Sequence, residues 1–91
     1  MPVYNEEKYI GECIRELRGV TEGLEKNGIK TEVLFVNDGS TDQSRRLLEE
    51  QAGQNAYTLI NHPANRGYGA ALKTGVRNAS YDTLCIIDAD G

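Results

Sequence analysis

Apolar and polar residues follow two alternating patterns along this chain. Short apolar runs predict buried strands at residues 32–37, 56–60 and 83–87, and a strand remnant at residues 2–3. Between these runs, apolar residues recur every three to four positions, which predicts helices. Strands that alternate with helices are joined by right-handed crossovers and form a parallel sheet. The pattern therefore predicts an α/β fold that forms one unit.

The predicted helices have start and stop signals. The first is expected to begin after Asn5, an N-cap followed by two acidic residues, and to end at Asn27-Gly28. The second is expected to open at residues 40–43, which have capping-box spacing, and to turn its two leucines inward. A third helical face is formed by Tyr68, Ala71, Leu72, Gly75, Val76 and Ala79.

The size and charge of the chain limit what it can do. Its 91 residues suffice for one small domain, and its net charge of −4 offers no cationic field for nucleic acid. No apolar stretch approaches the roughly 18 residues of a membrane span, and the N-terminus lacks a signal pattern. We therefore expect a cytoplasmic protein that does not bind nucleic acid, with Cys13 and Cys85 as buried, reduced thiols.

Polar, turn-forming residues follow every predicted strand. They occupy residues 4–6, 37–40, 61–69 and 88–90. Ligands of a parallel sheet bind outside the carboxyl ends of its strands. We therefore expect these four clusters to converge on one rim of the sheet and to form a site there.

The last of these clusters has the chemistry of a cation site. Asp88 and Asp90 follow an apolar run and stand before Gly91. Carboxylate oxygens are the ligands with which Mg²⁺ or Mn²⁺ is held beside substrate phosphates. Read alone, the same residues are equally compatible with an ordinary acidic turn.

Two further clusters suit a nucleotide. Arg66, Gly67 and Gly69 stand at a predicted helix N-terminus, where free amides and the helix dipole favour anions. The alternative is a surface charge beside a tight turn. Asp38 can accept a hydrogen bond from a nucleobase N–H or a ribose hydroxyl, and Gly39 would let a ring approach the backbone. The alternative for this pair is a turn followed by a helix cap.

The remaining polar residues are less specific. Tyr4, at the first strand end, is placed to pack against a base, unless it is a core aromatic. His62-Pro63 is expected to shape its loop rather than to bind a ligand. Two common phosphate motifs are excluded, because Leu72 stands where both a P-loop and a dinucleotide fingerprint need a glycine.

Four motifs, in this order and spacing, resemble the inverting family-2 glycosyltransferases, and most closely the dolichol- and undecaprenyl-phosphate sugar transferases. They are Pro2-Val-Tyr-Asn-Glu6, Val36-Asn-Asp-Gly-Ser-Thr-Asp42, Asn65-Arg-Gly-Tyr-Gly-Ala-Ala71 and Asp88-Ala-Asp-Gly91. The resemblance covers essentially the whole chain. It implies a GT-A fold, whose Rossmann-like, mostly parallel sheet binds a nucleoside-diphosphate sugar linked to UDP or GDP.

The resemblance also implies roles for individual residues. The nucleobase and ribose would be held by Pro2, Tyr4, Glu6 and Asp38. Arg66 would lie near the base and diphosphate. Asp88 would contact the ribose and the metal, and Asp90 would be the principal ligand of Mg²⁺ or Mn²⁺, which stabilises the departing nucleoside diphosphate. The implied acceptor is a polyprenyl phosphate.

The chain departs from the family pattern by omission. Only Met1 precedes the first motif, so the first strand, which lies between the second and fourth in the family, is truncated. The family's acceptor site and general base follow the Asp-x-Asp motif, so the catalytic base is unknown here. We expect residues 1–91 to be an incomplete, donor-binding N-terminal portion, inactive alone and membrane-peripheral only within a longer enzyme. Unpaired strand edges would favour self-association.

Two other functions stay open. A non-catalytic module would keep the fold for nucleotide binding or for pairing with another chain. A nucleotidyltransferase has a related sheet and metal carboxylates, but it would carry a glycine-rich, basic loop after the first strand. Here that position reads Tyr4-Asn5-Glu6-Glu7.

Overall fold

The apolar runs of the sequence pair into a parallel sheet. The computed structural model describes residues 1–55, 57–81 and 86–87. In chain order, its elements are β1 (Pro2–Val3), α1 (Ile10–Lys26), β2 (Leu34–Asp38), α2 (Ser44–Asn55), β3 (Thr58–His62) and α3 (Tyr68–Asn78). Strands alternate with helices, so the predicted α/β class is confirmed.

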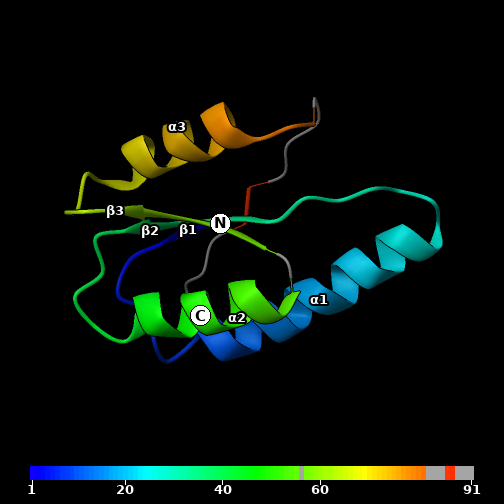
Figure 1. The fold of residues 1–91 in the computed structure, drawn as a ribbon, viewed down its shortest axis with the longest axis horizontal. Helices are drawn as coiled ribbons and strands as arrows, with labels where there is room; N and C mark the ends of the chain where they lie inside the picture. The colour runs from blue at the N-terminus through cyan, green and yellow to red at the C-terminus, as the bar shows by residue number, and fades with distance from the viewer. Residues whose placement is uncertain (56, 82–85, 88–91) are drawn as a thin grey trace.

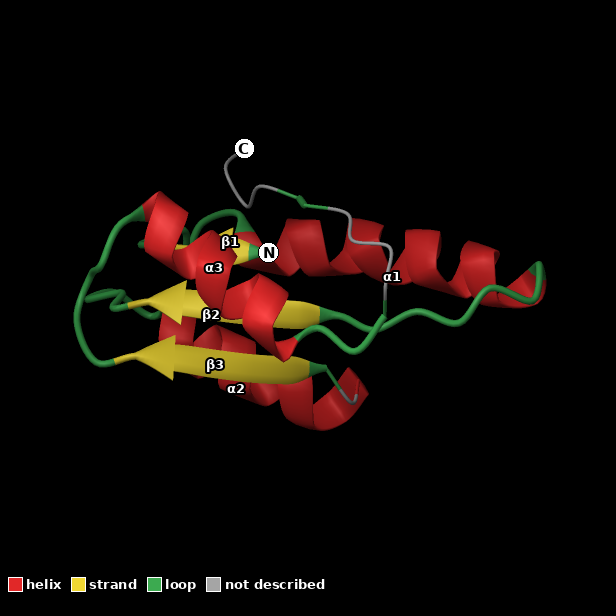
Figure 2. Cartoon of the chain, turned by 90° about the horizontal axis from the view of Figure 1, so that it is seen from above, coloured by secondary structure: helices red, strands yellow, loops and turns green. Residues whose placement is uncertain are grey.

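All strand pairs in the described sheet are parallel, in the order β1-β2-β3. β2 and β3 pair over their whole length, so their last residues, Asp38 and His62, are register partners. In Figure 1, α1 and α2 cover one face of the sheet and α3 covers the other. Figure 2 shows the strand arrows pointing to the same edge. The carboxyl ends of the strands therefore share one rim.

The core lies between the sheet and the helices α1 and α2. Phe35 of β2 is fully buried there, and the Tyr57 ring meets it edge-on with 5.5 Å between ring centroids. The other buried members of this core are Val3, Ile10, Ile14, Leu17 and Leu48. Since side chains alternate between the two faces of a strand, Val36 and Asp38 point to the opposite face, which α3 covers. This alternation directs the Asp38 carboxylate toward α3.

The first helix begins later than the sequence predicts. α1 starts at Ile10, and its N-cap is Tyr9, without a side-chain cap hydrogen bond. The Asn5 backbone has a φ of 50°, and its side chain accepts a hydrogen bond from the Thr41 amide at 2.8 Å. The prediction that Asn5 caps this helix is therefore wrong, because its side chain is used by a loop from another part of the chain. The predicted end at Asn27-Gly28 is confirmed.

The second helix also starts later than predicted. α2 begins at Ser44, and the Ser44 amide donates to Asp42 Oδ1 at 2.9 Å. The Ser40 hydroxyl accepts a hydrogen bond from the Asn5 amide instead of capping the helix. The capping-box prediction is therefore wrong, whereas the inward position of Leu48 is confirmed.

The third helix and the last predicted strand agree only in part with the sequence pattern. α3 buries Ala71, but Tyr68 and Val76 on its predicted apolar face are exposed. Of the predicted strand at residues 83–87, residues 83–85 lie outside the described part of the chain. Ile86 and Ile87 are described, and they are exposed and form no strand.

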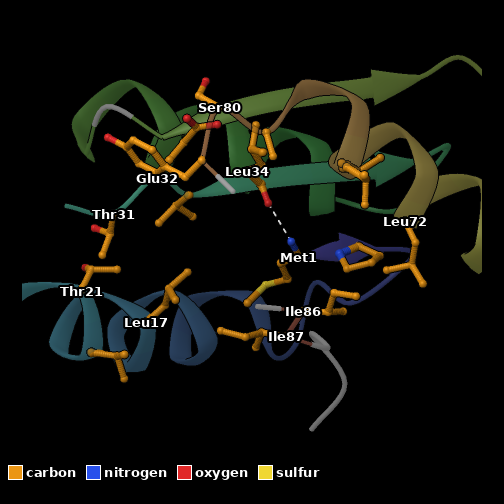
Figure 3. Close-up of a pocket in the computed structure, with 18 of the residues that line it drawn as sticks. Met1, Leu17, Thr21, Thr31, Glu32, Leu34, Leu72, Ser80, Ile86 and Ile87 are labelled. Carbon is orange, nitrogen blue, oxygen red and sulfur yellow. Dashed lines mark hydrogen bonds between the residues drawn. The ribbon is translucent and has the colours of Figure 1, made fainter. Parts of the chain in front are cut away.

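An apolar cavity of about 550 Å³ lies away from the rim. It is lined by α1, the start of β2 and the second half of α3, and the Met1 amine donates to the Leu34 carbonyl at its edge (Figure 3). Val20 and Ile29 line it and are at least half exposed. These two side chains are apolar surface that the rest of the chain does not cover. Self-association stays a prediction. None of the described helices has the length and apolar composition needed to cross a membrane.

Candidate functional site

Three of the four predicted polar clusters meet at the carboxyl edge of the sheet. Residues 4–7 follow β1, residues 37–44 end β2 and lead to α2, and residues 61–67 end β3 and lead to α3. Hydrogen bonds join the first cluster to the second and the second to the third. The fourth cluster, residues 88–90, lies outside the described residues.

The first junction holds the loop after β1 against the start of α2. The Glu6 amide donates to the buried Ser44 hydroxyl at 2.9 Å. The Glu7 amide donates to Asp42 Oδ2 at 3.2 Å, and Glu7 Oε2 accepts from the Gln43 amide at 3.2 Å. Burial raises the pKa of Asp42, but hydrogen bonds from Ser44 and Glu7 outweigh it and lower this pKa below its ordinary value. The two loops therefore hold each other through charged and backbone groups.

The second junction is built on the buried carboxylate of Asp38. Oδ1 accepts hydrogen bonds from His62 Nδ1 at 2.8 Å and from the Arg66 amide at 2.9 Å. Oδ2 accepts from the Gly67 amide at 2.9 Å and from Asn65 Nδ2 at 3.2 Å. A carboxylate offers about four lone-pair sites. All four are used by the protein, so Asp38 anchors the loop between β3 and α3.

The hydrogen bonds of Asp38 predict an acid-sensitive fold. Burial raises the pKa of Asp38, but the bonds from His62, Arg66 and Gly67 outweigh it and place this pKa below its ordinary value of 3.8. A carboxyl group with a depressed native pKa contributes stability above its unfolded-state pKa, and loses it as the pH falls through the native one.

The free energy of unfolding is therefore expected to fall as the pH drops through and below 3.8. Urea titrations at a series of pH values measure this loss. Asp42 contributes in the same pH range, so the matched comparison is Asp38→Asn, which should show a shallower pH dependence. Parallel curves for the two proteins would contradict the assignment.

The position of Gly39 differs from the role proposed for it from the sequence. Its φ is 69°, and a Cβ at this residue would meet the backbone of Ala64 and Asn65, with Ala64 Cα at 2.9 Å. The loop after β3 therefore occupies the space in which a ligand ring was expected to approach. Glycine is required at this position by the chain itself.

The predicted ligand-binding residues are only partly accessible. Tyr4 is 45% exposed, and the side chain of Arg66 is also exposed. Glu6 is half-buried, and Pro2 lies in β1 as the partner of Val36. The structure thus places four predicted residues on or beside the rim, whereas Asp38 is buried, with 3% of the residue exposed.

The N-terminus of α3 lacks a side-chain cap. The helix begins at Tyr68 after Gly67, whose φ is 96°, and its first turn contains no acidic residue. The first amides of a helix have no intrahelical acceptor, and the dipole makes this end positive. Arg66 precedes it directly. This part of the rim has the charge and the donors to hold an anion.

The metal site predicted from the sequence has no substitute within the described residues. Among them, no group of three or more Asp, Glu, His or Cys side chains is placed to hold a metal ion. Asp88 and Asp90 lie outside the described part of the chain. The metal hypothesis therefore depends on these two residues.

Sequence reasoning missed the network behind the rim. Asn37 Nδ2 donates to Asn61 Oδ1 at 2.9 Å, and His62 Nε2 lies 2.8 Å from Thr74 Oγ1. One signal was present in the sequence, since an acid directly after a buried strand needs hydrogen-bonding partners. The strand register then supplies them, because Asp38 and His62 are opposite each other.

Comparison with known proteins identifies the family. The model of glycosyl transferase family 2 matches residues 1–91. A dolichyl-phosphate beta-glucosyltransferase of Trichomonas vaginalis is 35% identical over an alignment of 97 positions, which covers 100% of this chain and 29% of that protein. An undecaprenyl-phosphate 4-deoxy-4-formamido-L-arabinose transferase of Pseudomonas fluorescens is 33% identical over an alignment of 92 positions, which covers 99% of this chain and 26% of that protein.

A third relative is an uncharacterized glycosyltransferase of Bacillus subtilis, 33% identical over 90 residues, which are 99% of this chain and 24% of that protein. The chain thus spans about a quarter of the length of these curated relatives. The resemblance to polyprenyl-phosphate sugar transferases is confirmed, and the parallel sheet agrees with a Rossmann-like GT-A half-domain. Because the family model matches every residue, the chain belongs to glycosyl transferase family 2.

Proposed function

We propose that this chain binds the nucleoside-diphosphate sugar of a glycosyltransferase that transfers the sugar, with inversion, to a polyprenyl phosphate. The observation that carries the proposal is the positive end of the α3 dipole, whose first turn holds no acidic residue, with the exposed Arg66 beside it, on the rim that also bears Tyr4. The names of two relatives, which act on dolichyl phosphate and undecaprenyl phosphate, support the acceptor class.

The diphosphate would bind at the start of α3. Its negative charge is matched by the helix dipole and by Arg66. The Asp38 carboxylate already holds the Arg66 and Gly67 amides, so it fixes where this helix begins. The anion would therefore meet a preorganised loop.

The base and ribose would bind across the rim, in the loop after β1. The exposed Tyr4 ring offers a surface on which a base can pack. The Glu6 carboxylate can accept a hydrogen bond from a ribose hydroxyl. The hydrogen bond from the Glu6 amide to Ser44 holds its backbone in place. Pro2 would support this loop from β1. A direct contact between Asp38 and the base stays a prediction, since it would replace one of the four hydrogen bonds described above.

A divalent metal would be held by Asp88 and Asp90. Bound Mg²⁺ or Mn²⁺ would neutralise charge on the departing nucleoside diphosphate. The described residues bind and orient the donor in this proposal, and none of them is assigned as the general base.

Calorimetric titration with UDP, GDP and Mn²⁺ tests the proposal. Arg66→Ala is expected to weaken diphosphate binding about tenfold, because it removes one charge-assisted contact. The affinity for uridine or guanosine, which carry no phosphate, should change much less. Arg45→Ala is the matched control, since Arg45 is an exposed arginine paired with Glu49 on α2.

The metal arm of the same experiment uses Asp88→Asn combined with Asp90→Asn. We expect this double variant to lose the Mn²⁺ dependence of UDP or GDP binding. If a demonstrably folded wild-type protein gave no heat with either nucleotide, the donor-binding proposal would be overturned.

A further inference from the structure

The charged residues are distributed unevenly along the chain. Residues 51–81 contain no aspartate or glutamate, although the whole chain has 14 acidic residues and a net charge of −4. The same stretch contains three cationic residues, Arg66, Lys73 and Arg77. It forms β3 and α3, so positive charge is gathered in one part of the fold. Such an asymmetry indicates a surface that meets an anionic partner.

The fold places the acidic residues of α1 and α2 across the sheet from α3. In Figure 1, α3 covers one face of the sheet by itself, whereas α1 and α2 cover the other. Two carboxylates lie nearer to α3. Asp38 is buried behind its N-terminus, and Glu32 lines the apolar cavity together with Ser80, just beyond its C-terminal end. The side of α3 that points away from the sheet, its outer face, is thus separated from the acids of α1 and α2 by the sheet itself.

The geometry of α3 turns two of the cations to this outer face. Ala71 is buried, and a Cβ at Gly75 would lie 3.7 Å from Val36 Cγ2, so these two residues mark the side toward the sheet. Residues two positions apart in a helix point in directions about 200° apart. Lys73 and Arg77 therefore point away from the sheet, and both are exposed. Since they are four residues apart, they are neighbours on that face.

The cations of α3 differ from the arginines of α2 in their partners. Both exposed arginines at the start of α2 pair with a glutamate one turn later, as Arg45 does with Glu49 at 2.8 Å. Within the part of the chain that the structure describes, neither Lys73 nor Arg77 forms an ion pair. Their charges are therefore available to an anion outside the chain.

Exposed tyrosines stand at both ends of this face. Tyr68 opens α3 and is 55% exposed, and Tyr81 follows the helix and is 49% exposed. Tyrosine favours the boundary between water and lipid, because its ring is apolar and its hydroxyl is polar. A nucleic acid is the less suitable partner, since the whole chain carries a net negative charge. Cations flanked by tyrosines fit the anionic surface of a bilayer.

We propose that the outer face of α3, with Lys73 and Arg77, docks on the anionic phospholipid headgroups of a bilayer. This inference rests on the proposed function, in which the acceptor is a polyprenyl phosphate. The apolar chain of such an acceptor lies in the bilayer, and its phosphate lies at the surface. The N-terminus of α3 bears the proposed diphosphate site, so docking along this helix brings the rim next to the lipid phosphates.

Sedimentation with vesicles tests the proposal. At low salt, the wild-type protein is expected to bind vesicles of phosphatidylcholine mixed with phosphatidylglycerol, but not vesicles of phosphatidylcholine alone. Added salt should release it, because salt screens exposed charges. Each cation near an anionic bilayer raises the affinity about fivefold, so Lys73→Gln combined with Arg77→Gln should weaken binding by about tenfold or more. No binding of the wild type to the anionic vesicles, or equal binding to both kinds, would overturn the proposal.

The matched control is Arg45→Gln combined with Arg46→Gln. It removes the same charge from the exposed surface of α2 and should bind vesicles like the wild type. Equal losses in the two double variants would mean that only net charge matters, which contradicts docking through α3. A loss of duplex DNA binding in the α3 variant, with vesicle binding unchanged, would identify a nucleic-acid surface instead and would also overturn the proposal.

The two proposals fail in distinguishable ways. The vesicles hold neither nucleotide nor polyprenyl phosphate, so a negative result with them overturns the docking inference and leaves donor binding to calorimetry. If calorimetry with UDP and GDP gave no heat while the α3 variant still lost its affinity for anionic vesicles, the proposed donor binding would be wrong and the lipid contact would stand.

Discussion

Replacing Asp38 by asparagine is expected to lower the free energy of unfolding by about 3 kcal/mol. Asparagine has the same shape, but one of its two terminal groups is an NH₂ donor. In either orientation this group faces two N–H donors, since each Asp38 oxygen accepts two hydrogen bonds. The substitution therefore leaves buried donors without an acceptor and removes the charge that holds them.

This loss is large for a small domain, whose total stability is about 5–15 kcal/mol. Urea denaturation of the two proteins at neutral pH measures it. Glu49→Gln is the control, because it also neutralises a hydrogen-bonded carboxylate, but on an exposed helix surface, and should change stability by less than about 1 kcal/mol. Equal effects of the two substitutions would mean that Asp38 does not anchor the loop.

Gly39→Ala is expected to destabilise the protein by about 3 kcal/mol and to displace the loop between β3 and α3. The added Cβ would collide with the backbone of Ala64 and Asn65, which cannot rotate away as a side chain does. Overpacking of this kind costs about 1–3 kcal/mol. The left-handed backbone adds about 1–2 kcal/mol for a residue with a Cβ.

Two matched glycines separate these contributions. Gly28 also has a positive φ, of 79°, but a Cβ there would meet nothing within 4 Å, so Gly28→Ala should cost only the backbone part. Gly19 lies in the middle of α1 with open space around it, and Gly19→Ala should stabilise the protein by up to about 1 kcal/mol. If Gly39→Ala were no worse than Gly28→Ala, the close approach of the loop would be refuted.

The order of elements and their chemistry could be predicted because they depend on local patterns. Apolar runs specify buried strands, and helical spacing specifies the helices that cover them. The rule that sites lie at carboxyl strand ends then brought residues 4–6, 37–40 and 61–69 to one rim. The structure confirms this convergence for the described clusters.

The precise helix starts could not be predicted, because their capping groups are engaged by distant residues. Asn5 and Ser40 have the composition of caps, but they bond each other's loops across a sequence separation of 35 residues. A propensity for capping describes which hydrogen bonds a side chain can make. It does not state which of the available amides is nearest in the folded chain.

The sequence by itself determined the family, the α/β order and the identity of the polar groups at the rim. Only the tertiary structure decided that Asp38 faces inward, where His62 and the loop before α3 use all of its lone pairs. The reason is that the pairing of β2 with β3 brings Asp38 opposite His62, which lies 24 residues later in the sequence. Because both residues are buried, their polar atoms must form hydrogen bonds with each other or with their neighbours. A sequence motif identifies these polar atoms, but the pairing of the strands determines which of them remain available to a ligand.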